Sequence, residues 1–217
     1  MSTVPSQRGS DPAHSHLASL PITRSENYFL SVEAVLKRLP FALIDRVTEA
    51  LWRAYLESRT VFVFGNGGSA ALASHCACDL GKGTVHNGNR RLRVIALTDN
   101  VPLMTAWAND ASYDDIFAEQ LMPLIHKADI ALAISGSGNS PNVLKALQVA
   151  REAEAFTIGL TGFQGGKMRA LCDLCVVVPS DNMQIIEDLH VSVSHSVFTS
   201  LRSRICTAAQ DLIRRQA

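Results

Sequence analysis

At 217 residues, the chain is long enough for one α/β domain with a substantial core and short for two. Its 20 basic and 20 acidic residues cancel, so no overall field favours nucleic acid or an anionic membrane surface. No apolar run approaches the roughly 20 residues that a membrane-spanning helix needs, and the N-terminus lacks the apolar core of a signal peptide. Together with an odd number of cysteines, five, these features predict a soluble, cytoplasmic protein that binds neither nucleic acid nor membrane.

The beginning of the chain differs in character from the rest. Residues 1–24 are polar and show no periodicity, so we expect a flexible tail ahead of a single domain that spans residues 25–217. Two amphipathic helices should follow the tail, near residues 26–39 and 41–57, with Pro40 ending the first. Helices in this position often form a layer of their own, and they could pack against another subunit.

From residue 60 onward, short apolar runs alternate with helix-like stretches. The expected strands are 61–64, 92–97, 130–134, 157–160 and 174–178, and the expected helices are 70–80, 101–125, 141–153, 167–171 and 183–207. Near-continuous apolar strands alternating with helices predict a parallel sheet covered on both faces. Right-handed crossovers then make the sheet doubly wound, with ligands at the carboxyl ends of its strands.

Two loops rich in Gly, Ser and Asn are the most informative feature of the sequence. Residues 65–69 (GNGGS) follow the first expected strand, and residues 135–140 (SGSGNS) follow the third. A strand that ends this way before a helix offers an anion unpaired N–H groups, hydroxyls and a helix N-terminus. Residues 98–100 (TDN) should reach the same edge of the sheet. Two hydroxyl-rich loops at one edge favour a phosphorylated ligand over simple tight turns.

Neither loop carries a complete nucleotide-binding fingerprint. The third glycine of G-x-G-x-x-G is Ala70 in the first loop, which makes a weak match, and Pro141 in the second. The P-loop pattern G-x-x-x-x-G-K fails because Cys76 and Thr161 stand where its first glycine would be. Nucleotide hydrolysis is therefore not expected.

The cysteines give a weaker signal. Cys172 and Cys175 have C-x-x-C spacing, but no second such pair exists to complete a structural zinc site. The second of them enters the last expected strand, and buried, inert thiols are the better interpretation of both.

Two groups of titratable residues could support proton transfer. His75 and Asp79 are four apart in a helix that follows the first loop, so they share one helix face. Glu187, Asp188 and His195 lie on the last expected helix, where the latter two share a face. Taken singly, each of these residues is more easily explained by packing, by a surface position or by the helix dipole.

Four motifs together resemble the sugar isomerase (SIS) domain and, more narrowly, the bacterial phosphoheptose isomerases. They are GNGGSA at 65–70, AND at 108–110, ISGSGNSPNV at 134–143 and GLTGFQGGK at 159–167. The likeness extends from about residue 26 to residue 203. It implies a flavodoxin-like, five-stranded parallel sheet with an N-terminal helical layer, and a homotetramer with active sites between subunits. It also implies interconversion of sedoheptulose 7-phosphate and D-glycero-D-manno-heptose 7-phosphate.

The resemblance also implies the roles of individual residues. The substrate phosphate and its surroundings would be held by Asn66, Gly67, Gly68, Ser69, Asp99, Asn100, Ser135, Gly136, Ser137, Asn139 and Ser140. Ketose–aldose interconversion needs a base that removes and returns a proton, and an acid for the carbonyl oxygen. His195 would act in acid–base transfer, with Asp79 or Glu187 as the partner base. His75, Asp79, Glu187 and His195 would also bind one Zn²⁺ per subunit.

Three positions depart from the family pattern. Asp79 replaces a glutamate, so its carboxylate is one methylene shorter. Glu187 replaces a glutamine and adds a negative charge that favours a divalent cation. Gly83 stands in place of an arginine, beside Lys82, which supplies a charge but no planar fork.

Other activities remain open at this point. A non-catalytic SIS-domain regulator of replication initiation lacks the catalytic carboxylate and binds protein as a tetramer; retention of His75, Asp79 and His195 favours the enzyme. A phosphosugar-sensing domain or an amino-sugar phosphate isomerase is a third interpretation. The neutral charge argues against direct DNA contact, and an amino-sugar enzyme would need a second domain or partner.

Overall fold

The computed structural model describes residues 22–86 and 90–216. The expected tail, residues 1–24, lies almost wholly outside this part of the chain. Within the described ranges, no helix is both long and apolar enough to cross a bilayer.

Five parallel strands form a single sheet, as predicted. They are β1 (Thr60–Gly65), β2 (Arg93–Ala96), β3 (Ile130–Ile134), β4 (Phe156–Thr161) and β5 (Leu174–Val177). Their order across the sheet is β2-β1-β3-β4-β5, and all four neighbouring pairs are parallel. This is the flavodoxin-like, doubly wound order, whose chain reverses direction across the sheet between β1 and β3. The fold class predicted from the sequence is confirmed.

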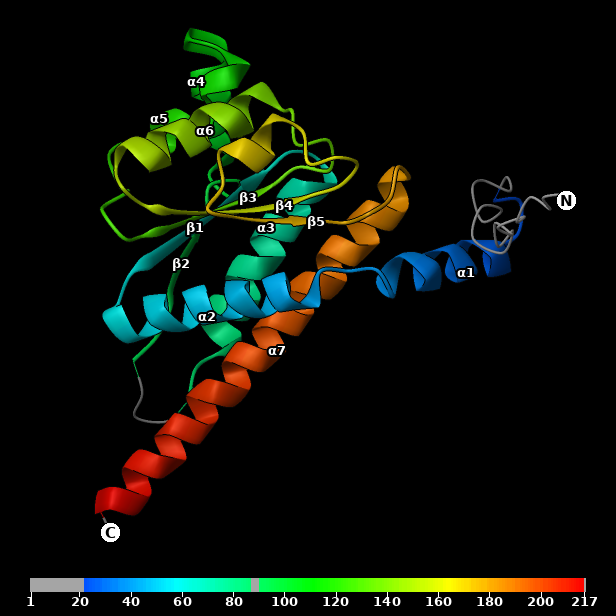
Figure 1. Ribbon diagram of the computed structural model, residues 1–217. Coiled ribbons are helices and arrows are strands. Elements are labelled where there is room, and N and C mark those ends of the chain that lie inside the picture. Colours follow the sequence, from blue (N-terminus) through cyan, green and yellow to red (C-terminus); the bar gives the residue numbers. More distant parts are fainter. Residues whose placement is uncertain (1–21, 87–89, 217) are drawn as a thin grey trace, which may run out of the picture.

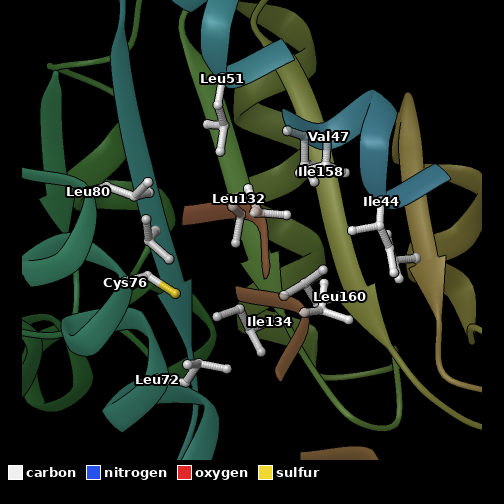
Figure 2. Packing of buried hydrophobic residues seen from close by; sticks show 14 of the residues in the cluster. Ile44, Val47, Leu51, Leu72, Cys76, Leu80, Leu132, Ile134, Ile158 and Leu160 are labelled. Carbon is white, nitrogen blue, oxygen red and sulfur yellow. The ribbon is translucent and has the colours of Figure 1, made fainter. Parts of the chain in front are cut away.

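Helices cover both faces of the sheet (Figure 1). The described part of the chain forms the helices α1 (Ser25–Leu36), α2 (Phe41–Glu57), α3 (Gly68–Cys78), α4 (Val101–Asp110), α5 (Ala118–Leu121), α6 (Pro141–Glu152) and α7 (Met183–Gln216). The larger core lies between the sheet and α2, α3 and α7, and the second lies under α5 and α6. Figure 2 shows the larger core, in which Ile44, Val47 and Leu51 of α2 face the β3 and β4 side chains Leu132, Ile134, Ile158 and Leu160.

The two N-terminal helices have different environments. The apolar stripe of α2 packs directly on the sheet, whereas α1 extends from the body of the molecule (Figure 1). The Tyr28 hydroxyl on α1 donates a hydrogen bond of 2.6 Å to Asp188 on α7. Farther along α1, Phe29 and Leu30 are 68% and 57% exposed. The helix therefore carries an apolar surface that this chain does not cover.

Three boundaries differ from the sequence-based expectation. The helix predicted over 101–125 breaks after Asp110, because Ser112 accepts a hydrogen bond from the Asp114 N–H and starts the 3₁₀ turn Tyr113–Asp115. The stretch 167–171 is a 3₁₀ turn, η4 (Lys167–Ala170). The last helix continues past residue 207 to Gln216, since buried Ala209 prolongs the stripe of Leu201 and Ile205.

One ionisable side chain is sealed between α7 and the sheet. His190 is 1% exposed, and within the described part of the chain neither ring nitrogen has a hydrogen-bond partner. Burial lowers the pKa of His190 to about 4, from an ordinary value of 6.5. The unfolded chain therefore binds more protons between these two values, and folding stability falls as the pH drops from 6.5 toward 4.

Replacing His190 with leucine should remove this contribution to acid sensitivity. Between pH 7 and pH 5 the unfolding free energy of the wild type should fall by about 2 kcal/mol more than that of the variant. Urea unfolding followed by circular dichroism measures both. Replacement of the exposed His126 by glutamine should leave the wild-type difference unchanged; equal losses in the wild type and His190→Leu would contradict the assignment.

Candidate functional site

The two glycine-rich loops leave the sheet side by side. Gly65, the last residue of β1, is the register partner of Ile134, the last residue of β3. A Cβ on Gly65 would lie 2.5 Å from the Ile134 carbonyl oxygen, so this approach requires glycine. The loops therefore open at the point where the strand order reverses, which is the usual ligand position in such sheets.

Each loop leads into a helix whose N-terminus has no side-chain cap. Helix α3 begins at Gly68, after Gly67 with φ +54°, and α6 begins after Ser140. The helix N-termini thus present N–H groups and positive dipole ends at the same edge, beside the buried Ser69. Helix α4 differs, because the Asn100 side chain accepts a hydrogen bond from the Leu103 N–H and caps it. Asn100, predicted to bind substrate, is thus occupied in capping.

The second loop turns its hydroxyls together. The Ser135 and Ser140 hydroxyls are 3.2 Å apart, and the Ser137 hydroxyl accepts the N–H of Asn139 at 3.2 Å. The Asn139 side-chain oxygen accepts the N–H of Lys167 at 3.0 Å, so this residue ties the loop to η4. Gly136 is buried, with a Cβ excluded by the Met183 sulfur at 2.5 Å. The Ser135 and Ser140 hydroxyls therefore lie together at the end of β3, and Asn139 holds the loop against η4.

An asparagine pair joins the two loops, and one partner was not identified from the sequence. Asn66 and Asn142 exchange amide hydrogen bonds of 2.9 Å in both directions. Asn142 is 1% exposed and its oxygen also accepts the N–H of Val143, while the Tyr113 hydroxyl donates to the Asn66 oxygen at 3.1 Å. The pair fixes the Asn66 amide at the rim of the site. The only signal in the sequence was that Asn142 lies within the SPNV motif. Its pairing with Asn66 depends on a tertiary contact.

Asp99 lies at the carboxyl end of β2 and is held from α3. The Ser74 hydroxyl donates a hydrogen bond to its carboxylate. Thr98 lies beside this pair, with its hydroxyl 3.1 Å from that of Ser74. Asp99 therefore lies at the same sheet edge as the two loops, on the side of β2.

Farther along α3, two histidines and an aspartate converge. His75 Nε2 lies 3.3 Å from Asp79 Oδ2 and 3.3 Å from His195 Nε2. His195 Nε2 lies 3.8 Å from Asp79 Oδ2. Asp79 begins the π-helical turn Asp79–Gly83, a local distortion that is frequent at functional sites. A 2.8 Å contact between the Cys76 sulfur and the Ser194 hydroxyl holds α7 against α3 next to this cluster.

The cluster has the geometry of a metal site. A tetrahedral zinc with ligands at 2.0–2.2 Å places its donor atoms about 3.3–3.5 Å apart. The observed triangle of 3.3, 3.3 and 3.8 Å is close to one face of that tetrahedron. Both imidazoles are about half exposed, at 49% and 47%, so the cluster is accessible from solvent. These three residues fit a divalent cation of the zinc class.

Glu187, predicted as the fourth ligand, lies at another level of the contact between α3 and α7, which we call the seam. A Cβ on Gly68 would be 3.2 Å from both of its carboxylate oxygens, so Glu187 faces the start of α3. It precedes His195 by eight residues, or about 12 Å along the helix axis. The cluster of converging donors contains His75, Asp79 and His195 without it. Asp188, which shares a face with His195 by heptad spacing, bonds instead to Tyr28.

Comparisons with known proteins bear on this arrangement. Residues 27–162 match the SIS domain family. The phosphoheptose isomerase of Pelobacter propionicus is 39% identical over 165 residues, covering 76% of this chain and 86% of that protein. That of Aliarcobacter butzleri is 45% identical over 137 residues, covering 63% and 72%. The structure of a phosphoheptose isomerase from Francisella tularensis has a TM-score of 0.76 and 31% identity, covering 82% of this chain and 96% of that one.

The buried asparagine offers a direct test of the loop geometry. Asn142→Ala leaves the Asn66 amide without its partner and should cost about 1–3 kcal/mol of unfolding free energy. Inorganic phosphate should raise the melting temperature of the wild type by binding the folded state, and it should protect the variant less. The control Asn109→Ala removes an exposed amide bonded only to Asp110 and should change neither quantity. Unaltered phosphate protection in Asn142→Ala would show that the pair does not shape the site.

Proposed function

Because the chain belongs to the SIS-domain family and, within it, to the phosphoheptose isomerases, we propose that it interconverts sedoheptulose 7-phosphate and D-glycero-D-manno-heptose 7-phosphate. The observation that carries this proposal is the distance between the start of α3, beside the two glycine-rich loops, and the His75–Asp79–His195 cluster. Gly68 and His75 are seven residues apart on α3, or about 10 Å along its axis. Glu187 and Ser194 lie against these two levels of α3, so α7 runs beside it in the same direction.

A seven-carbon sugar phosphate matches this length. Eight bonds separate C1 from the phosphorus atom, and an extended chain advances about 1.2 Å per bond, by analogy with polypeptide. The span is therefore about 9–10 Å. With its phosphate at the uncapped start of α3, an extended heptose would place C1 and C2 beside His75, Asp79 and His195.

The two loops would hold the phosphate. Ser69, Ser135 and Ser140 supply hydroxyls at the meeting point of the helix N-termini, and the fixed Asn66 amide supplies a further donor. Neutral donors and helix dipoles suit a dianion at the strand ends without a lysine or arginine. Glu187, which lies against the start of α3, would accept hydrogen bonds from sugar hydroxyls near the phosphate rather than bind the phosphate itself.

The cluster would carry the proton transfer. A base removes a proton from C1 of the ketose, the electron pair forms the C1=C2 bond, and the C2 oxygen takes up a proton. The enediol then loses the proton of its O1 hydroxyl, and C2 is protonated to give the aldose. We assign the base to Asp79 and the transfer at oxygen to His195, since these groups lie 3.8 Å apart and Glu187 lies outside the cluster.

A divalent cation would fit the same cluster. His75, Asp79 and His195 would be its protein ligands, as their spacing indicates, and we propose Zn²⁺ with one ion per chain. When bound, it supplies a Lewis acid for the substrate oxygens. A His195 Nε2 that binds the ion has no lone pair for proton transfer, so the acid–base role assigned to His195 applies to the metal-free site.

We also propose that the protein works as a homotetramer in the cytoplasm. The exposed apolar side chains of α1 favour burial against another chain, and the family resemblance indicates that this is a second copy of the same chain. All five cysteines are free thiols, which suits a reducing compartment.

Substitutions in the cluster should abolish turnover while leaving the phosphate loops intact. Asp79→Asn and His195→Ala should each lower kcat by about 10²–10⁴-fold, because a proton-transfer group is removed. Aldose formation from sedoheptulose 7-phosphate, followed by NMR, measures this, and Asp79→Glu should keep most of the rate. His126→Ala, on an exposed histidine, is the matched control. A wild type that binds the ketose without turnover would favour the protein-binding regulator instead.

Native mass spectrometry tests the metal and the assembly together. The wild type should appear as four chains with four zinc ions, and His75→Ala should retain the four chains with much less metal, since one of three ligands is lost. Protein purified without chelator is required. A metal-free wild type, or a monomeric mass at micromolar concentration, would contradict the respective proposal.

A further inference from the structure

The C-x-x-C pair forms a feature that the proposed activity does not use. Sequence reasoning favoured buried, inert thiols, but Cys172 and Cys175 are both only partly buried in the structure. Both sulfurs approach a single point above Gly159 on β4. A Cβ at that glycine would lie 2.8 Å from the first sulfur and 3.3 Å from the second. Two thiols thus share one small space.

Glycine makes this space possible. Gly159 is the register partner of Cys175 across β4 and β5, so its missing side chain leaves a gap directly beside that sulfur. The gap is filled by the Cys172 sulfur and by the Met168 methyl group, which would be 3.0 Å from a Cβ. Any larger residue at 159 would separate the two thiols.

The two sulfurs have unequal acidity. The neighbouring Cys175 and burial together raise the pKa of the Cys172 thiol far above its usual range. The pKa of Cys175 is lowered, first because the adjacent Cys172 thiol stabilises its thiolate and further because of the Arg169 charge. A thiol whose pKa is lowered by a neighbouring protonated thiol is the arrangement of dithiols that exchange with disulfides.

We propose that Cys172 and Cys175 are a reversible thiol–disulfide pair that reacts with low-molecular-weight disulfides such as oxidised glutathione. The Cys175 thiolate attacks one sulfur of the small disulfide, whose S–S bond breaks and releases one thiolate. The Cys172 thiol then loses its proton, attacks the mixed disulfide at Cys175 and releases the second small thiol. The protein gains one S–S bond and loses two hydrogens, and one small disulfide is reduced to two thiols.

The pair is joined to the phosphate loop through η4. The N–H groups of Lys167 and Met168 donate to the Asn139 side chain at 3.0 Å and to the Gly138 carbonyl at 2.9 Å. Met168 is fully buried and reaches the sulfurs from the same turn. Drawing the sulfurs together would therefore displace Met168 and shift η4 against the loop. This consequence rests on the proposed function of that loop; the disulfide itself does not.

Peptide mapping gives a readout that is independent of isomerase activity. Trypsin cleavage after Arg169 and Arg202 yields a peptide that contains Cys172 and Cys175 and no other cysteine. After incubation of the native protein with oxidised glutathione and blocking of free thiols, this peptide should be lighter by two hydrogens than its reduced form. Dithiothreitol should reverse the change. A peptide with both thiols blocked, under conditions that modify exposed Cys78, would overturn the proposal.

Single variants test the order of attack, and phosphate binding tests the link to the loop. Cys172→Ser should trap glutathione on Cys175, because no second thiol remains to release it, and Cys175→Ser should prevent the intramolecular disulfide; Cys206→Ser should behave as wild type. The oxidised protein should bind inorganic phosphate about fivefold more weakly, a modest coupling between sites. Equal affinity of both forms would overturn the link to the loop, and trapping on Cys172 alone would overturn the assigned roles.

Discussion

The adjacency of the β1 and β3 carboxyl ends is the constraint on which the site depends. Since the strand order reverses there, the connections after these strands pass to opposite faces of the sheet and leave the edge between them open. Gly65 permits the close approach, and the Asn66–Asn142 pair spans the opening. Two helix N-termini then meet at one point. The N–H groups that would bind an anion at this edge are placed by backbone topology, and the side chains refine the arrangement.

The direction of α7 determines where the remaining candidate site residues lie. It starts near the second loop, passes Gly68 at Glu187 and reaches α3 again at Ser194, so the start of α3 and the His75–Asp79–His195 cluster lie on one continuous seam. Its buried face is fixed by the apolar stripe that includes Ile186 and Val193. Rotation of that stripe would separate His195 from His75. Within the described residues the same packing leaves the His190 ring nitrogens without a hydrogen-bond partner, so core packing and acid sensitivity arise from one helix placement.

The sequence allowed much of this to be predicted, for identifiable reasons. Strands with continuous apolar runs and loops with Gly and Ser are local signals, and the sheet, the two loops and the His75–Asp79 face follow from them. Contacts between distant segments are not local. Helical spacing placed Asp188 and His195 on one face, yet Asp188 turns to Tyr28 and Glu187 to Gly68. Asn142 and the convergence of the two C-x-x-C sulfurs required the register of β4, β5 and the loops, which no periodicity encodes.

Two departures from the family pattern are linked in the structure. A Cβ on Gly83 would lie 2.6 Å from the Phe198 ring, so the absence of a side chain there lets α7 approach the π-helical turn closely. Phe198 is one helical turn beyond His195, and the turn begins at Asp79. The close approach therefore brings the imidazole toward a carboxylate that is one methylene shorter than glutamate, and the two groups still lie 3.8 Å apart. An arginine at position 83 would force Phe198 outward and lengthen that gap. The short acid at position 79 and the glycine at position 83 are thus compatible as a pair.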